Sequence, residues 1–181
     1  FIENHDTDRF LGEGNNLPML KQASTLLLTT RRIPQLYYGT EVMMNGVKSK
    51  SDGYVRKDFP GGWTGDATNA LTPAGRTKIQ NECYDFYKTI LNWRKGNDVI
   101  AKGSMVQFMV QNGVYAYARQ YEGKTVFVML NGTDAETTVP LKFYKEILKN
   151  SKQGKDILSG KAITFGEELK MGPRESLVIE L

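Results

Sequence analysis

The sequence is poor in cysteine, histidine and proline, and it has no long apolar run. Cys83 is the only cysteine among 181 residues, and His5 is the only histidine. A single cysteine excludes an intrachain disulfide and a metal site built from several thiolates. The apolar runs, such as residues 125–130, are far shorter than the ~20 residues that a membrane-spanning helix needs. We therefore expect no metal site and no membrane span.

The charge balance is also modest. Lys and Arg number 24 and Asp and Glu number 20, which leaves a formal net charge of +4. A nucleic-acid-binding protein gathers its basic residues on one face. Here Glu146 and Asp156 interrupt the densest basic stretch, so we expect a solvated surface and no nucleic-acid partner. That stretch contains Lys142, Lys145, Lys149, Lys152 and Lys155.

The first half of the chain alternates between predicted strands and predicted helices. Residues 1–4 and 33–38 have the composition of short buried strands, whereas residues 17–32 and 72–95 show helical periodicity. This order is typical of an α/β fold. Two parallel strands cannot close a barrel, and the chain starts with Phe1 inside a predicted strand. We therefore expect the chain to be part of a longer protein.

The second half is rich in predicted strands. Asn112-Gly113 separates two β-rich runs, residues 105–110 and 114–119, and this is a strong hairpin signal. Another strand is predicted at residues 125–130, and residues 142–148 fit a helix or a strand equally well. The pattern predicts a small antiparallel β-sandwich, with a domain boundary between residues 1–99 and 100–181. Further short strands are expected at residues 137–139, 155–158, 162–165 and 176–181.

Several motifs, in order along the chain, resemble one known enzyme family. Residues 1–6 (FIENHD) are similar to the motif that ends the seventh barrel strand in the α-amylase superfamily, glycoside hydrolase family 13. Residues 33–41 (IPQLYYGTE) resemble its eighth strand, and residues 85–95 (DFYKTILNWRK) resemble its final helix. Residues 52–63 (DGYVRKDFPGGW) are similar to a loop of neopullulanase-like and cyclomaltodextrinase-like enzymes. The resemblance implies the last two βα units of a (β/α)8 TIM barrel, followed by a β-sandwich.

The resemblance also implies a chemistry. Family members are retaining glycosidases that cleave α-glucans such as starch, pullulan, maltooligosaccharides and cyclodextrins, without a cofactor. Their nucleophile and general acid follow earlier strands, so this chain is expected to lack both and to be inactive by itself. Asp6 matches the third carboxylate, which binds sugar hydroxyls and stabilises the oxocarbenium-like transition state. His5 would donate a hydrogen bond to the same sugar, and Asn4 would orient its neighbours.

The other candidate side chains fit two roles each. Arg56 and Asp58 lie in the glycine-rich loop, where they either contact substrate or form an exposed ion pair. Trp63 either stacks on a sugar ring or anchors the loop, and we favour anchoring. Asp8 and Arg9 are expected to form a local ion pair that holds the turn.

Two other functions compete with that of an active glycosidase. The chain could be a non-catalytic carbohydrate-binding or structural β-sandwich module, or part of a catalytically inactive relative. Tyr115, Tyr117 and Tyr121 share one face of a predicted strand. Exposed rings would favour carbohydrate binding, whereas the same spacing also suits a buried core. The Asn4-His5-Asp6 motif favours the enzyme, since a binding sandwich has no need of it.

Some properties follow only from the resemblance or from the unpaired strands. Bond preference stays open between α-1,4 and α-1,6 cleavage, and a bacterial periplasm or cell surface is the location that the resemblance implies. Unpaired barrel edges expose backbone donors and acceptors. We therefore expect the isolated chain to aggregate or to form a homo-oligomer through those edges.

Overall fold

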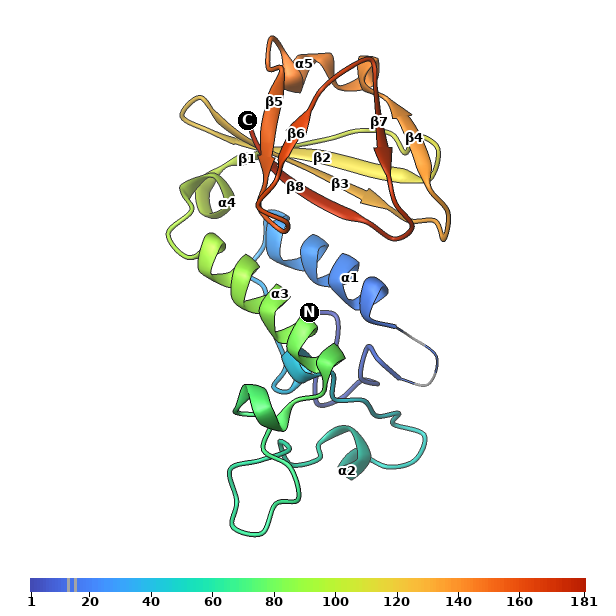
Figure 1. Ribbon diagram of the computed structural model, residues 1–181, viewed down its shortest axis with the longest axis vertical. Helices are drawn as coiled ribbons and strands as arrows, with labels where there is room; N and C mark the ends of the chain where they lie inside the picture. Colours follow the sequence, from blue (N-terminus) through green and yellow to red (C-terminus); the bar gives the residue numbers. More distant parts are fainter. Residues whose placement is uncertain (13, 15) are drawn as a thin grey trace. The chain divides into compact units, whose positions relative to one another are not determined.

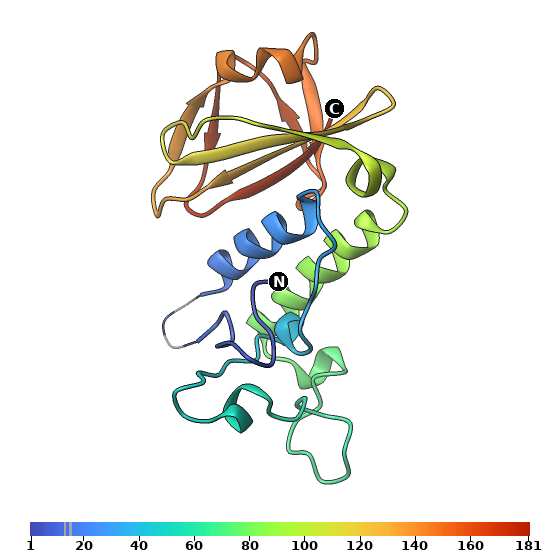
Figure 2. The ribbon, with the colours of Figure 1, turned by 180° about the vertical axis from the view of Figure 1, so that it is seen from behind.

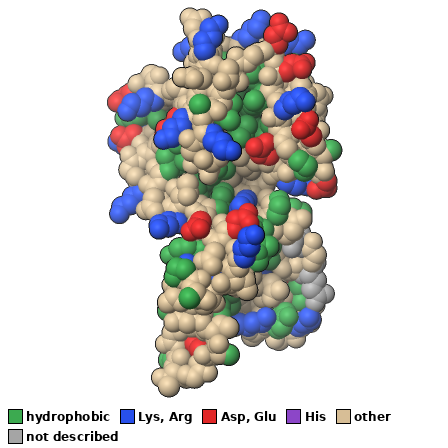
Figure 3. Space-filling view, in the orientation of Figure 1, with side chains coloured by type: hydrophobic (Ala, Val, Ile, Leu, Met, Phe, Trp, Pro, Cys, Tyr) green, Lys and Arg blue, Asp and Glu red, His purple; other side chains and the backbone are tan. Residues whose placement is uncertain are grey.

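The computed structural model describes residues 1–12, 14 and 16–181. The chain divides into two compact units, drawn in Figure 1 and from behind in Figure 2. Unit 1 contains residues 1–27 and 33–88, and unit 2 contains residues 28–32 and 89–181. Among the described helices, none combines the length and the hydropathy that crossing a membrane requires. Acidic and basic side chains are intermixed over the face shown in Figure 3.

Unit 1 is organised around two helices that sequence periodicity predicts. Helix α1 spans Leu17–Thr29 and helix α3 spans Lys78–Arg94. Leu17 and Leu20 of α1 and Cys83 and Phe86 of α3 are buried, whereas Ile79 at the start of α3 is 49% exposed. Between the helices, the Ser24 and Tyr87 hydroxyls lie 2.5 Å apart. The remaining elements are short: η1 at Thr40–Val42, α2 at Asp52–Val55 and η2 at Pro73–Gly75.

The two strands predicted in the first half do not form. Residues 1–4 and 33–38 lie outside every helix and strand, and all strands in the described part of the chain belong to unit 2. A strand needs a neighbour to complete its hydrogen-bond ladder, and these segments have none. The helix predicted at residues 72–95 also starts later, at Lys78. Thr72 instead caps the separate turn of η2, where its side chain accepts a hydrogen bond from the Gly75 amide at 3.3 Å.

Unit 2 contains the antiparallel sheets that the sequence predicts. A large sheet has six strands in the order β1-β2-β3-β8-β5-β6, and a small sheet pairs β4 with β7. The strands are β1 Ser104–Gln107, β2 Val114–Tyr121, β3 Lys124–Asn131, β4 Thr137–Pro140, β5 Gln153–Asp156, β6 Ala162–Thr164, β7 Glu168–Met171 and β8 Ser176–Glu180. Strand β7 was not predicted from the sequence, because it is short and half exposed. The ambiguous segment proves to be helical, with η3 at Leu141–Tyr144 and α5 at Lys145–Leu148.

Two tight turns set the register of the large sheet. Asn112 and Gly113 have φ values of 49° and 79°, and Glu122 and Gly123 have φ values of 47° and 79°. Two successive residues with positive φ are typical of the type I′ hairpin turn. The first turn confirms the predicted hairpin. The second joins β2 to β3 so that Tyr117 lies opposite Val128.

Both faces of the large sheet are buried. Ala116, Ala118, Phe127 and Met129 pack towards the small sheet, α5 and η3. The alternate residues, including Tyr117, pack on the other face against Val99 and Ile100 of α4, which spans Asp98–Lys102. Tyr117 has no exposed surface. The tyrosine spacing on β2 is therefore that of a core face and not of an exposed aromatic platform.

A buried arginine ties residues 28–32 to the large sheet. The guanidinium of Arg119 donates to the carbonyl oxygens of Ser104 at 3.2 Å, Gly103 at 2.8 Å and Thr29 at 2.9 Å. The Tyr117 and Thr29 hydroxyls lie 2.5 Å apart. Burial lowers the pKa of Arg119, but the three carbonyl acceptors satisfy its donors. This is why the end of α1 belongs to unit 2.

Candidate functional site

The Asn4-His5-Asp6 motif forms a tight polar turn in unit 1. The side-chain oxygen of Asn4 accepts a hydrogen bond from the Asp6 amide at 2.8 Å, and the Asn4 amide donates to the Thr7 hydroxyl at 3.0 Å. An Asn side chain that bonds to the backbone two residues later mimics a backbone turn. Asn4 therefore orients its neighbours, and Asp6 and His5 extend from the turn into solvent.

The Asp6 carboxylate lies between two basic side chains. Its Oδ2 is 3.1 Å from His5 Nε2, and its Oδ1 is 3.1 Å from Arg56 Nη2. Arg56 Nε also donates to the His5 carbonyl at 2.9 Å. The Asp6 side chain nevertheless keeps 59% of its surface exposed. The structure thus brings together three of the predicted site residues and leaves the carboxylate accessible.

Two further charged residues, Lys48 and Asp52, complete this cluster, and neither was predicted from the sequence. Arg56 Nη2 also contacts Asp52 Oδ2 at 3.2 Å, and Lys48 Nζ contacts Asp52 Oδ1 at 3.6 Å and the Asp6 carbonyl at 3.1 Å. Asp52 opens α2, where the Ser51 side chain accepts from the Tyr54 amide. The signal in the sequence was the four-residue spacing of Lys48, Asp52 and Arg56, which is the spacing at which ion pairs form on a helix, although α2 itself covers only Asp52–Val55.

A buried ion pair holds the backbone next to the cluster. Arg9 Nη1 lies 3.3 Å from Glu3 Oε1, and both side chains are almost completely buried. The same guanidinium donates to the Val55 carbonyl at 3.0 Å and to the Tyr38 carbonyl at 2.5 Å. It also lies 4.0 Å from the ring centre of Tyr37. Arg9 therefore holds the residue next to Arg56 against two other segments.

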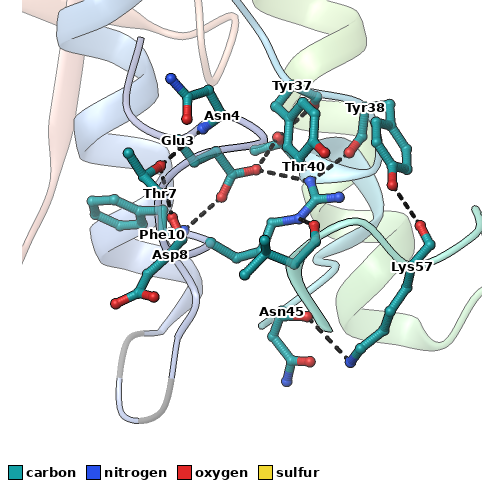
Figure 4. A network of polar contacts seen from close by, with 12 residues as sticks. Glu3, Asn4, Thr7, Asp8, Phe10, Tyr37, Tyr38, Thr40, Asn45 and Lys57 are labelled. Atoms are coloured by element: carbon teal, nitrogen blue, oxygen red, sulfur yellow. Dashed lines mark hydrogen bonds and ion pairs between the residues drawn. The ribbon is translucent and has the colours of Figure 1, made fainter. Parts of the chain in front are cut away.

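The Glu3 carboxylate has two further hydrogen-bond partners. Its Oε1 accepts from the Thr40 hydroxyl, and its Oε2 accepts from the Phe10 amide at 2.5 Å. Figure 4 shows Glu3 between Thr40 and Phe10, with contacts to both. Hydrogen bonds of this kind compensate for the cost of removing a charged pair from water. The pair thereby fixes residues 3–10, 37–40 and 55 as one rigid base.

The predicted local pair of Asp8 with Arg9 does not form. Arg9 turns inward to Glu3, while Asp8 Oδ1 accepts from the Lys48 amide at 2.5 Å. Sequence proximity was a poor guide here because Arg9 gains carbonyl acceptors inside the unit that an exposed turn does not offer.

Two other predicted residues lie outside the cluster. Asp58 is exposed, and within the described part of the chain its side chain makes no hydrogen bond or ion pair. Trp63 has 72% of its surface exposed, so our interpretation that its ring anchors the loop is wrong. At this point of the loop, the Trp63 backbone amide donates to the Asp66 carboxylate at 2.9 Å.

The chemistry available at this cluster is that of a positioned, charged acceptor. A carboxylate forms strong hydrogen bonds with hydroxyl groups and opposes positive charge that develops nearby. His5 adds a donor or an acceptor beside it. Over residues 1–12, 14 and 16–181, no three His, Cys, Asp or Glu side chains gather as a metal-binding group.

Comparison with known sequences identifies similar proteins. Residues 105–180 match the family described as the cyclo-malto-dextrinase C-terminal domain. An α-amylase of Niallia circulans is 31% identical over 174 residues, which cover 92% of this chain and 28% of the relative. A cyclomaltodextrin glucanotransferase of Thermoanaerobacterium thermosulfurigenes is 32% identical over 181 residues, which cover 96% of this chain and 22% of the relative. The chain spans about a quarter of the length of these relatives.

Solved structures show the same fold. An Anoxybacillus α-amylase superposes with a TM-score of 0.75 at 20% identity, over 99% of this chain and 36% of that protein. The α-amylase of Geobacillus thermoleovorans, solved with acarbose, superposes with a TM-score of 0.73 at 24% identity, over 99% of this chain and 37% of that protein.

Proposed function

Because this chain belongs to the α-amylase family, we propose that it is part of a retaining glycoside hydrolase that acts on α-glucans. The substrates are starch, pullulan, maltooligosaccharides or cyclodextrins. The names of the similar proteins support this class, since they include an α-amylase and cyclomaltodextrin glucanotransferases. The neopullulanase-like or cyclomaltodextrinase-like loop, residues 52–63, supports the finer assignment.

The observation that carries the proposal is the exposed Asp6 carboxylate on a rigid base. In the proposed reaction Asp6 accepts hydrogen bonds from hydroxyls of the sugar whose bond is cleaved. As the sugar carbon acquires positive charge, the carboxylate stabilises it without reorganisation, because His5 and Arg56 already hold it. A preorganised charge of this kind lowers the transition state more than the ground state.

The neighbours of Asp6 have supporting roles in this proposal. His5 donates to a sugar hydroxyl, Asn4 holds the turn, and Arg56 and Asp58 contact substrate from the glycine-rich loop. Arg56 keeps 40% of its side chain exposed, which leaves donors for a ligand. Asp58 has no competing partner in the described part of the chain.

We propose further that the nucleophile and the general acid lie outside this chain. Retaining hydrolysis needs two carboxyl groups on either side of the scissile bond. In the site cluster, Arg56 ties Asp6 to Asp52 in one ionic group. The proposal gives Asp6 the role of the third carboxylate, so the nucleophile and the general acid would come from other parts of the complete enzyme.

The domain arrangement that we propose follows the family. Residues 1–99 would form the last two βα units of a TIM barrel, and residues 100–181 its C-terminal β-sandwich. The helices α1 and α3 and the site turn after residue 4 occupy the order that a βα unit requires. Upstream strands would supply the ladder partners that residues 1–4 and 33–38 need to become strands.

A non-catalytic module is the alternative function. The match of residues 105–180 to a C-terminal domain family favours it. Two observations count against it. Tyr117, which would be part of an aromatic platform on β2, is completely buried, and the cluster around Asp6 has no role in a structural module.

The test replaces Asp6 by Asn in the complete enzyme that contains residues 1–181. We expect kcat/KM on pullulan, soluble starch or a cyclodextrin to fall about 10²–10³-fold, as for other preorganised polar groups. Asn keeps the shape and an acceptor for Arg56, so the fold should persist. Asp134→Asn is the matched control, because Asp134 is an exposed carboxylate in unit 2 that pairs with Arg174. That control should keep activity within about twofold of wild type.

A second experiment assays the isolated 181-residue chain. It should release no oligosaccharide from the same substrates, since two carboxyl groups are proposed to lie elsewhere. Release that disappears with Asp6→Asn would place all of the machinery within these 181 residues and overturn that part of the proposal. Full activity of the Asp6→Asn enzyme would remove Asp6 from the reaction.

A further inference from the structure

Unit 2 contains a cleft of about 540 Å³ beside α5. One wall is formed by η3, α5 and the turn that follows α5. The other wall is formed by the segment that joins β6 to β7. The inward side chains of the first wall, Leu141, Tyr144, Ile147 and Leu148, are buried in the core between the two sheets. The cleft wall is therefore held firmly in place.

Four lysine side chains line this cleft. They are Lys142, Lys145, Lys149 and Lys152. All four are exposed, and in the described part of the chain none of their ammonium groups is in an ion pair or a hydrogen bond. Lys142 Nζ makes a cation–π contact, 5.4 Å from the ring centre of Phe143. Like charges gathered at one cleft raise the local positive potential and attract an anion.

The two acidic residues that interrupt this stretch in the sequence do not neutralise the cleft. Glu146 is not among the lining residues. Asp156 points inward with 1% of its surface exposed, and its carboxylate accepts from the Ser159 amide at 2.9 Å and the Val178 amide at 3.0 Å. Folding therefore removes the charge of Asp156 from the surface, whereas Glu146 stays exposed on α5 outside the cleft lining. Glu167 and Glu168 do line the far wall, which leaves a formal lining charge of four minus two, or +2.

Lys149 occupies an unusual backbone conformation in this wall. Its φ is 48° and its ψ is −115°, and its amide donates to the Lys145 carbonyl at 2.8 Å. A residue with a side chain rarely adopts such a positive φ, and this strain accumulates at functional sites. A glycine would adopt this conformation at lower cost, yet the cleft has a lysine at this position.

We propose that this cleft binds a phosphate group. Phosphate suits it because a compact, multiply charged anion accepts several hydrogen bonds at once, and ammonium groups on flexible stems converge on such a centre. The group can belong to a free phosphate or to a lipid headgroup, and the chemistry is the same. This binding is independent of the glycosidase proposal, since it uses no residue of the Asp6 cluster.

The test measures binding of inorganic pyrophosphate to the full chain by titration calorimetry at low and high NaCl. A cleft variant, Lys145→Gln with Lys149→Gln, is compared with Lys155→Gln with Lys161→Gln. The second pair removes the same charge from exposed positions of unit 2 that do not line the cleft. We expect the cleft variant to bind at least about tenfold more weakly, because two charge-assisted hydrogen bonds are lost. The control variant should stay within about twofold of wild type, and added salt should weaken binding of wild type.

A second arm identifies the source of the phosphate. Vesicles of phosphatidylcholine with phosphatidylglycerol are sedimented with the chain, with and without pyrophosphate. Vesicle binding that pyrophosphate displaces and the cleft variant lacks assigns a lipid headgroup, whereas pyrophosphate binding without vesicle binding assigns a free phosphate. The proposal is overturned when the low-salt titration shows no binding, or when both variants weaken binding equally.

Lys149→Gly separates binding from stability. Glycine adopts the positive φ without strain, so this variant should unfold at a higher temperature than wild type while it binds pyrophosphate more weakly. A variant that gains stability and keeps full affinity would remove Lys149 from the site.

Discussion

At the scale of single residues, the Glu3–Arg9 pair is an ion pair buried inside unit 1. Removal of one partner of a buried ion pair leaves an uncompensated charge and costs about 3–5 kcal/mol. We expect Arg9→Met to lower the free energy of unfolding of unit 1 by that amount in urea denaturation followed by circular dichroism. Lys21→Met is the control, because Lys21 pairs with the exposed Glu82 at 2.6 Å and such a pair contributes less than about 1 kcal/mol. Equal losses in the two variants would contradict the special role of Arg9.

Burial of the Cys83 thiol leads to a prediction about how the stability of the fold depends on pH. Burial raises the pKa of Cys83 to about 12 from a reference value of 9.0. The unfolded thiol therefore loses its proton at lower pH than the folded thiol, and its contribution to stability is lost as pH rises from about 9 towards 12. We expect the stability difference between wild type and Cys83→Ala to shrink across that window in denaturation experiments. In the folded chain at pH 8, Cys83 should react with a disulfide reagent only after urea is added.

Much of the site could be predicted at this scale, and what was missed has a physical reason. The motif Asn4-His5-Asp6 and Arg56 were identifiable because neighbouring polar residues of these types are informative. Lys48 and Asp52 were missed because they join the cluster only through Arg56 and Lys48, which reach Asp6 across more than forty residues of sequence. Trp63 was misjudged because the packing of a loop is not encoded in its own composition.

At the scale of elements, the two tight turns of the large sheet allow a matched comparison. A Cβ on Gly113 would lie 2.4 Å from the Thr133 methyl group, whereas a Cβ on Gly123 would meet nothing within 4 Å. Both glycines have a φ of 79°, so both Ala variants carry the conformational cost of about 1–2 kcal/mol. Gly113→Ala should lower the free energy of unfolding more than Gly123→Ala does, because the clash with Thr133 adds to the conformational cost. Chemical denaturation of the two variants measures that difference directly, and equal losses would mean that Thr133 moves aside freely.

Elements were predictable where local signals agreed with packing. The helices α1 and α3 and the hairpin between β1 and β2 were anticipated, because their apolar periodicity and turn residues specify them locally. The predicted strands at residues 1–4 and 33–38 failed for a different reason. Strand-like composition becomes a strand only when a neighbour completes the ladder, and composition carries no information about that neighbour.

At the scale of the whole molecule, exposed apolar residues predict association. Ile33 is 97% exposed and Phe1 is 60% exposed in unit 1. Large exposed apolar side chains of this kind mark interaction or aggregation surfaces. We expect the isolated chain to form higher species as its concentration rises, as measured by sedimentation velocity, and Ile33→Glu should reduce them. Met109→Glu is the control, since Met109 is 83% exposed in unit 2. A monomer at every concentration, with one cooperative unfolding transition, would contradict this expectation.

The sequence by itself determined the family, the α1 and α3 helices, the antiparallel tail and the identity of Asp6, His5 and Asn4 as a motif. These features depend on local periodicity, on turn chemistry and on short runs of residues. Only the tertiary structure decided which charges meet. It placed Arg9 on Glu3, joined Arg56 and Asp52 to Asp6, buried Asp156 and left four lysines together at one cleft. The reason is that an electrostatic contact depends on distance in space and on burial, and neither is set by position along the chain.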